Sequence, residues 1–189
     1  MLGSAFDDVI ASAQSGAEWA VGALWRDLRP AVLRYLRVMA PSAAEDIDSE
    51  TWFAVARGLS RFQGGEDDFR AWVFTIARHR LIDWRRREAH RPEAVVPVEA
   101  LANSPASDDP AVEALEELST QDALALIATL PPDQAEVILL RVVAGLDGRR
   151  VAELVGKRPG AVRVLQHRAL RRLATRVVER AAERGGVTP

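Results

Sequence analysis

The side chains best suited to chemistry in this sequence lie between residues 163 and 171, on one face of a predicted helix. At about 100° per residue, that face holds Arg163, Val164, His167, Arg168 and Arg171. Arginine presents a planar fork of donors that matches both phosphate oxygens and the major-groove edge of guanine. We therefore expect this face to bind DNA. The alternative is the solvated face of an ordinary helical bundle.

Two short helices with a turn between them have to position this face. We expect them over residues 148–155 and 159–173, with Pro159 in a first helical turn, where a missing N–H costs nothing. Gly156 permits the positive φ that ends the first helix. Small and apolar residues fall where two crossing helices would pack: Ala152, Val162, Leu165, Ala169 and Leu173. This spacing predicts a helix-turn-helix, whose second helix usually enters the major groove of DNA.

The amino-acid composition excludes several kinds of site and of protein. The 189 residues are 48% hydrophobic, which suffices for one domain or two small ones. There is no cysteine, and the three histidines have no partner at metal-ligand spacing, so we expect no disulfide, metal or cofactor. No apolar run is long enough to span a membrane, and the first residues lack the basic and apolar regions of a signal peptide. We expect a cytoplasmic protein without membrane insertion.

The net charge of −2 conceals strong segregation of charge along the chain. Residues 69–91 hold seven arginines and two acids, and residues 141–189 hold twelve bases and four acids. Residues 92–120, which lie between them, hold seven acids and no base. Two basic segments separated by an acidic one predict two contacts with nucleic acid.

An acidic helix is expected from about residue 42 to residue 58. Its apolar residues recur at helical spacing and face inward, which leaves Asp46, Asp48 and Glu50 on the exposed side. An acidic helix face is usually solvated surface. The sharper hypothesis is a docking face for a basic partner.

A long amphipathic helix is expected over residues 68–88, after a turn-rich loop with two adjacent glycines. Arg70, Arg78 and Arg85 line up within about 80° of one another on it. The tryptophans of this helix are interpreted as core, with stacking on bases as the alternative. The predicted buried stripe comprises Phe69, Trp72, Val73, Ile76 and Trp84.

Prolines divide the chain into two parts. Between residues 92 and 112 they interrupt every helical period, and the acids there favour an extended, solvated segment. The predicted fold is therefore all-α, with two small helical domains over residues 1–91 and 113–184. An acidic, proline-containing flexible linker over 92–112 joins the two domains. The C-terminal domain is predicted to be a helix-turn-helix domain, and residues 185–189 are predicted to form a frayed tail.

Three blocks of the sequence, in this order and spacing, resemble a known family. They are AEDIDSETWFAVARGLSRF, FRAWVFTIARHRLIDWRRRE, and LPPDQAEVILLRVVAGL followed by AELVGKRPGAVRVLQHRALRRL. By these blocks the chain is identified as a member of the extracytoplasmic-function (ECF) group of bacterial RNA polymerase sigma factors, in the sigma-70 family. The resemblance implies a protein that is not an enzyme. Such a protein binds core RNA polymerase, recognises the −35 and −10 promoter elements and helps to melt DNA.

The resemblance also implies partners and residue roles. Core polymerase (the β′ clamp helices and the β subunit), promoter DNA and an anti-sigma protein are the implied partners, and Asp46, Asp48 and Glu50 would bind the clamp helices. Arg150, which stands where members often carry an acidic or aromatic residue, would add a phosphate contact. The residues implied for the −10 element are Arg61, Phe62, Arg70, Arg78, His79, Arg85 and Arg86, with His79 where members often carry asparagine. Those implied for the −35 element are Arg149, Arg158, Arg163, Val164, His167, Arg168 and Arg171.

Two other function classes compete with this interpretation. A stand-alone helix-turn-helix regulator would explain residues 121–175 but neither the acidic block nor the helix that begins FRAW. A hydrolase built on Asp46, Asp48, Glu50 and a histidine has no nucleophile motif, glycine-rich phosphate loop or metal-ligand pair to support it.

Overall fold

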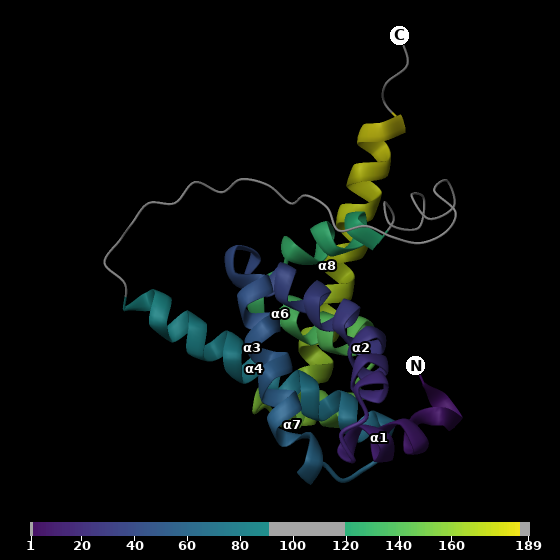
Figure 1. Ribbon diagram of the computed structural model, residues 1–189. Helices are drawn as coiled ribbons and strands as arrows, with labels where there is room; N and C mark the ends of the chain where they lie inside the picture. The colour runs from purple at the N-terminus through teal and green to yellow at the C-terminus, as the bar shows by residue number, and fades with distance from the viewer. Residues whose placement is uncertain (1, 91–119, 186–189) are drawn as a thin grey trace.

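The computed structural model describes residues 2–90 and 120–185, and both ranges are built from helices, with no strand among them (Figure 1). The first range contains α1 (Phe6–Gln14), α2 (Glu18–Met39), α3 (Ala44–Gly58) and α4 (Glu66–Ala89), with 3-10 turns at Gly3–Ala5, Pro41–Ala43 and Leu59–Arg61. The second contains a helix over 120–128, α6 (Pro132–Ile138), a wide π-helical turn (Leu139–Val143), α7 (Gly148–Val155) and α8 (Pro159–Gly185). The predicted all-α class is confirmed, and the predicted linker over 92–112 lies outside the described residues. None of the helices in the described ranges has the length and apolarity needed to cross a membrane.

The N-terminal bundle forms because α2 presents an apolar residue on the same face at every turn. Leu24, Leu28, Val32 and Leu36 are four residues apart and buried, and α2 packs on α3 and α4. Burying side chains of this size contributes roughly 1.5–3 kcal/mol each. The inward face of α4 adds Phe69, Val73, Phe74, Ala77 and Leu81 to this core. Packing of these faces holds α3 and α4 side by side and leaves their outer faces to solvent.

Glycine and an acid shape the loop between α3 and α4. Gly64 has a φ of +136°, and a Cβ added there would lie 2.7 Å from the Cβ of Asp68. Asp68 in turn accepts a hydrogen bond through Oδ2 from the N–H of Gly65 at 3.0 Å, which caps the first turn of α4. The loop therefore requires glycine at residue 64, both for its backbone conformation and for the space that Asp68 occupies.

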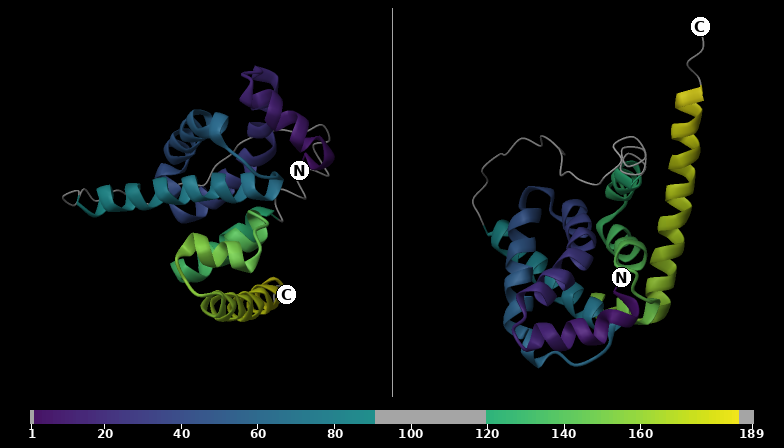
Figure 2. Two further views of the ribbon diagram at one scale, coloured as in Figure 1. Left: turned by 90° about the horizontal axis from the view of Figure 1, so that it is seen from below. Right: turned by 45° about the vertical axis from the view of Figure 1, so that its right-hand side comes forward.

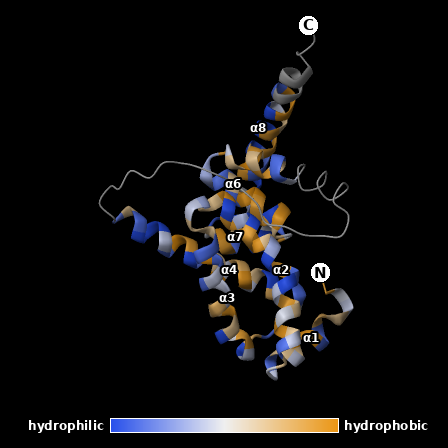
Figure 3. Cartoon of the chain, turned by 45° about the horizontal axis from the view of Figure 1, so that its top comes forward, coloured by the Kyte–Doolittle hydropathy of each residue, from blue (hydrophilic) through white to orange (hydrophobic). Residues whose placement is uncertain are grey.

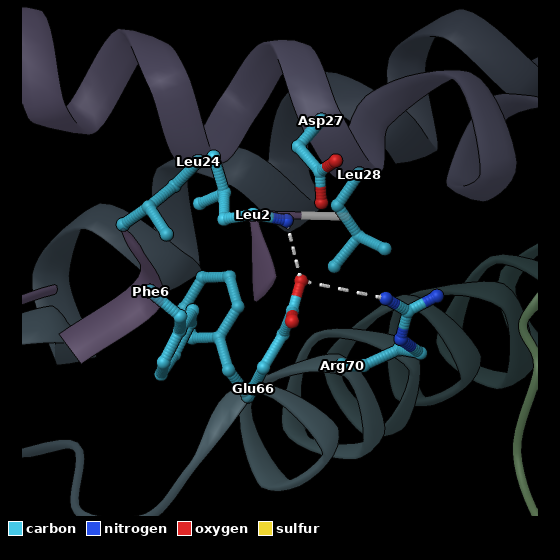
Figure 4. Close-up of a pocket in the computed structure, with 8 residues that line it drawn as sticks. Leu2, Phe6, Leu24, Asp27, Leu28, Glu66 and Arg70 are labelled. Carbon is cyan, nitrogen blue, oxygen red and sulfur yellow. Dashed lines mark hydrogen bonds and ion pairs between the residues drawn. The ribbon is translucent and has the colours of Figure 1, made fainter. Parts of the chain in front are cut away.

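Glu66 ties the N-terminal arm to the start of α4 (Figure 4). Its carboxylate accepts hydrogen bonds from the N–H groups of Leu2 and Gly3 at 2.8 and 3.0 Å, and it lies 3.9 Å from the guanidinium of Arg70. The cavity left among these side chains measures about 10 Å³, roughly the room of a single water. The arrangement anchors the arm and leaves no room for a larger ligand.

The C-terminal bundle has an aliphatic core and an unusual turn in its middle. Leu139 and Leu140 are fully buried in the wide turn, where Ala144 donates its N–H to the carbonyl of Leu139, five residues earlier, at 2.9 Å. The two bundles lie against each other along α2, which contacts α6 and this wide turn (Figure 2). The contact leaves the far side of α8 facing solvent.

We predict that Gly64→Ala destabilises the N-terminal bundle. The left-handed conformation is strained for alanine, and the added Cβ meets Asp68, so the free energy of unfolding should fall by about 1–3 kcal/mol. Urea denaturation measures this. Gly160→Ala is the matched control, because a Cβ at residue 160 meets nothing within 4 Å. Equal stability of the two variants would contradict the prediction.

Candidate nucleic-acid interface and the acidic helix

The predicted helix-turn-helix is present with the geometry expected of it. Asp147 caps α7 by accepting through Oδ1 from the N–H groups of Arg149 and Arg150, at 2.8 and 2.9 Å. Gly156 ends α7 with a φ of +67°. Val162 and Ala169 are buried against the rest of the bundle, as their spacing predicts. The cap was not predicted, although an aspartate directly before the first helical residue is a local signal for it.

The side of α8 opposite this packing stripe carries the basic residues. Figure 3 shows hydrophilic residues alternating with hydrophobic ones along α8. The exposed set contains every residue that the sequence assigned to the −35 element: Arg149, Arg158, Arg163, Val164, His167, Arg168 and Arg171. Arg149 lies 3.8 Å from Glu153 on its own helix, a pair that is open to solvent and worth little in stability. This surface is free to meet a DNA groove.

The residues assigned to the −10 element divide into two groups. Arg61, His79 and Arg86 are exposed. Phe62 is half-buried, and its ring packs on those of Phe69 and Trp72, with centroids 5.3 and 5.2 Å apart. The same cluster confirms the interpretation of Trp72 as a core residue, since it is half-buried among aromatic rings.

The three aligned arginines of α4 are half-buried and bind groups of the protein itself. Arg70 lies 3.9 Å from Glu66 on the same helix. Arg78 donates through Nε to Glu136 in α6 at 2.9 Å, and Arg85 donates to the carbonyl of Met39 at 3.0 Å. The alignment of the three arginines on one side of α4 was predicted, but their contacts with other groups of the protein were not; their role at the −10 element stays a prediction. Two of these contacts are tertiary, because Arg78 and Arg85 find acceptors on segments distant in sequence, whereas the partner of Arg70 is four residues away on α4 itself.

The acids of α3 do not share one exposed face. Asp46 and Glu50 are exposed, and Glu50 lies 3.5 Å from Arg87 of α4. Asp48 is only 2% exposed, so its predicted place on the exposed side is wrong. It faces α2, where Arg29 donates through Nε to its Oδ2 at 2.8 Å.

Asp48 acts as a joint between α2 and α3. Its second oxygen accepts from Nε1 of Trp52 at 3.1 Å, and Arg29 also reaches Glu45 at 3.3 Å. Burial raises the pKa of the Asp48 carboxyl, and the bond and charge of Arg29 act in the opposite direction. Because a buried carboxylate is tolerated only when it is paired, Arg29 is the residue that allows Asp48 to lie here.

One exposed aromatic residue on α3 was not among the predicted site residues. Phe53 is 66% exposed and follows Asp46 by seven residues and Glu50 by three, so the three share one side of the helix. The guanidinium of Arg57 lies 5.8 Å from the centroid of its ring. A large apolar residue in register with two exposed acids was the available signal. Exposed aromatic residues are enriched in protein interfaces, so Phe53 marks this side of α3 as a candidate protein-binding face.

Polar contacts between the two bundles were not predicted either. The hydroxyl of Tyr35 in α2 donates to Oε1 of Glu136 at 3.0 Å, and burial together with the Glu136 charge holds the Tyr35 pKa well above its usual range. Arg150, expected to contact phosphate, instead binds Asp68 of α4 at 2.7 Å and the carbonyl of Asp67 at 2.9 Å. The partners in these contacts are 82 to 101 positions apart, a separation at which no local pattern of the sequence would reveal them.

Within residues 2–90 and 120–185, no three histidine or acidic side chains come together as a possible metal site. Exposed charged or aromatic side chains lie on three parts of the described helices: the α3 side with Asp46, Glu50 and Phe53, the loop and helix α4 with Arg61, His79 and Arg86, and the α7–α8 pair.

Two family models match the chain. Sigma-70 region 2 matches residues 24–91, and Sigma-70 region 4 matches residues 120–173. A relative of the chain is the ECF RNA polymerase sigma factor SigD of Mycobacterium bovis. It is 35% identical over 185 residues, which cover 94% of this chain and 86% of SigD.

Two solved structures share the fold. The sigma factor RpoE from Bartonella quintana, in complex with the anti-sigma factor NepR, matches with a TM-score of 0.61 and 25% identity, over 79% of this chain and 91% of that one. CnrH, in complex with the cytosolic domain of CnrY, matches with a TM-score of 0.61 and 21% identity, over 93% of this chain and 99% of that one.

We predict that Arg29→Leu destabilises the joint between α2 and α3. It leaves the buried Asp48 carboxylate without its charged donor, which should cost roughly 1.5–3 kcal/mol of unfolding free energy. Arg26→Leu, at an exposed position on the same helix, is the control. Chemical denaturation measures the free energy of unfolding of both variants. If Arg29→Leu is as stable as Arg26→Leu, the proposed role of the Arg29–Asp48 pair is refuted.

Proposed function

Because the chain belongs to the ECF group of RNA polymerase sigma factors, we propose that its three exposed surfaces each bind a different part of the transcription initiation complex. The α3 face binds core polymerase, α4 with its preceding loop binds the −10 element, and the α7–α8 pair binds the −35 element. The observation that carries this assignment is the exposure of an acidic-aromatic surface on α3 and of basic residues at two other places in the same chain, the loop and helix α4 and the α7–α8 pair. The sigma-70 region 2 match supports it against a stand-alone helix-turn-helix regulator.

The domain boundaries belong to the same proposal. Residues 1–91 form the domain for core polymerase and the −10 element, and residues 113–184 form the −35 domain. The matches to residues 24–91 and 120–173 support these limits. The protein acts in the cytoplasm by binding alone and catalyses no reaction. Since RpoE of Bartonella quintana is bound by an anti-sigma factor, an anti-sigma partner is proposed for this chain as well.

The α3 face suits a basic partner with an apolar pocket. Asp46 and Glu50 supply negative charge, and Phe53 supplies an exposed aromatic ring between them and Arg57. Binding energy in protein interfaces concentrates in a few residues, often aromatic side chains that fill a pocket of the partner. Asp48 does not touch the partner in this proposal; it holds α3 in position from beneath.

The −10 element is held by capture of unstacked bases rather than by catalysis. Separating a base-pair step costs about 1.4 kcal/mol, and stacking one flipped base on a side chain returns roughly 1–3 kcal/mol. Trapping one or two bases near the loop before α4 therefore offsets the cost of starting the bubble. Exposed Arg61, His79 and Arg86 lie on the surface that the strand would follow.

We predict that Asp46→Arg and Phe53→Ala each weaken binding to core polymerase at least about tenfold, since each removes part of one continuous contact. Fluorescence anisotropy with sigma-free core polymerase and no DNA measures the affinity. Asp83→Arg makes the same charge reversal at an exposed site on α4 and should bind as the wild type does. Unchanged affinity in both α3 variants would remove this face from the docking site.

Run-off transcription tests the function as a whole. Wild-type protein with core polymerase and a library of promoter fragments should give specific transcripts whose upstream sequences define both elements. Arg163→Ala and His167→Ala should lower −35-dependent initiation, because each lost base contact costs about 1–3 kcal/mol of binding free energy. Arg172→Ala is the control and should leave initiation unchanged, because Arg172 is exposed on the opposite side of α8 from Arg163. Absence of both transcripts and core binding would overturn the proposed function.

A further inference from the structure

The loop between α3 and α4, residues 59–65, is tied at its start to the last residue of α1. The side-chain amide of Gln14 donates through Nε2 to the carbonyl of Leu59 at 3.1 Å and to that of Phe62 at 2.7 Å. The Leu59 carbonyl also accepts from the N–H of Phe62 at 3.1 Å, within the 3-10 turn. One glutamine amide therefore binds both carbonyls of the turn, from 45 and 48 positions earlier in the chain.

The N-terminal arm holds the other end of the same loop (Figure 4). Glu66, the first residue of α4, accepts through Oε1 from the N–H of Leu2 at 2.8 Å. Its second oxygen, Oε2, accepts from the N–H of Gly3 at 3.0 Å. Each carboxylate oxygen thus binds one backbone donor of the arm. Residues 2–14, here called the N-terminal segment, therefore contact the loop where it begins and where it meets α4.

Aromatic rings join the N-terminal segment to the loop as well. Phe6 of α1 is 2% exposed, and the centroid of its ring lies 5.8 Å from that of Phe69 in α4. The ring of Phe62 in the loop also packs on Phe69, at 5.3 Å. Phe69 is a shared neighbour of the segment and the loop, so apolar packing supports the hydrogen bonds at both ends.

The middle of the loop gains from being held at its ends. Gly64 and Gly65 lie there, and glycine loses more conformational freedom on ordering than any other residue. A loop that is ordered only when its ligand binds pays this cost out of the binding energy. Contacts that fix the loop beforehand remove part of that cost. The contacts come from the N-terminal segment, which precedes residues 24–91, the part that matches sigma-70 region 2.

This inference rests on the proposed function, in which the loop before α4 takes unstacked bases of the −10 element. We propose that the N-terminal segment holds this loop in its base-binding conformation, and that Gln14 is the positioning residue of the contact. The segment binds no DNA itself. It lowers the entropic cost of capturing a base, and so favours promoter opening. Arg61 lies in the turn that Gln14 binds, so its backbone is fixed by the same amide.

The side-chain chemistry of Gln14 fits this role. A glutamine amide carries two N–H donors on one nitrogen, one for each of the two carbonyls. Methionine has a similar length but donates no hydrogen bond, and glutamate would present only acceptor oxygens to the carbonyls. Both are good helix formers. Substitution of Gln14 by methionine therefore removes the contact with the loop while it keeps α1 helical and the net charge unchanged.

Hydrogen exchange followed by mass spectrometry tests the contact in the free protein. Gln14→Met should speed the exchange of the backbone amides of residues 60–65 by about 5- to 20-fold, because two hydrogen bonds to the loop are lost. Ser15→Ala is the matched control, since the Ser15 hydroxyl donates to the carbonyl of Ser12 at 2.8 Å, within the same end of α1. Equal exchange of the loop in the two variants would overturn the positioning role.

Promoter opening tests whether the held loop serves base capture. The whole chain is assembled with core polymerase on a promoter found by run-off transcription, and permanganate footprinting of unpaired thymines measures the melted fraction. Gln14→Met should lower the equilibrium for opening by about fivefold or more, and Ser15→Ala should leave it unchanged. Affinity for core polymerase and binding of −35 duplex should stay at the wild-type level in both variants, whereas a misfolded variant would lose all three.

Unchanged opening with Gln14→Met would overturn the proposal. Failure of the proposed function would appear differently: the wild type itself would give no melted DNA, while the loop of Gln14→Met would still exchange faster than that of Ser15→Ala.

Discussion

Each arginine on α4 needs either water or an acceptor, because a guanidinium loses its hydration when it is buried and cannot lose its charge. This constraint governs how the two bundles are arranged. α4 is both a core helix and a strongly basic one, so it packs through its apolar face while its half-buried arginines reach acceptors nearby or on other segments. Glu66 on α4 itself, Glu136 of α6 and the carbonyl of Met39 provide them. Of these three acceptors Glu136 belongs to the C-terminal bundle, so the pairing of Arg78 links the two bundles in addition to the packing of α2 on α6 and the wide turn.

The same rule explains the acidic helix. Of its four acids, Glu45 and Asp48 face the arginines of α2, whereas Asp46 and Glu50 face outward. The acidic residues of α3 therefore lie on two sides of the helix, one facing α2 and the other facing solvent. Asp48 positions the helix from its buried side and Glu45 binds Arg29 and Arg37 at the surface, whereas Asp46 and Glu50 lie on the side proposed to bind a partner.

The local elements were predictable from the sequence, but the long-range pairs were not. Apolar spacing, Pro159 and Gly156 were enough to predict the α7–α8 pair and the exposed side of α8, since these depend on residues a turn or two apart. Asp48 was misplaced because its burial depends on Arg29, nineteen positions earlier on another helix. The ion pair of Arg78 was not foreseen for the same reason, as its acceptor Glu136 lies 58 positions away. Helical periodicity carries no information on which charge a second helix will supply.

The position of Tyr35 gives the junction an optical label of its own. It is the single tyrosine of the chain, and all five tryptophans lie in residues 19–84, so the intrinsic absorbance and fluorescence of the protein arise in the N-terminal bundle. With the domains together, the phenol is buried against Glu136 and its pKa is held above the usual value near 10. When the chain is denatured and the phenol meets water, it ionises in the ordinary range. The ultraviolet spectrum at alkaline pH therefore reports whether the burial of Tyr35 at this junction is intact, without any added dye.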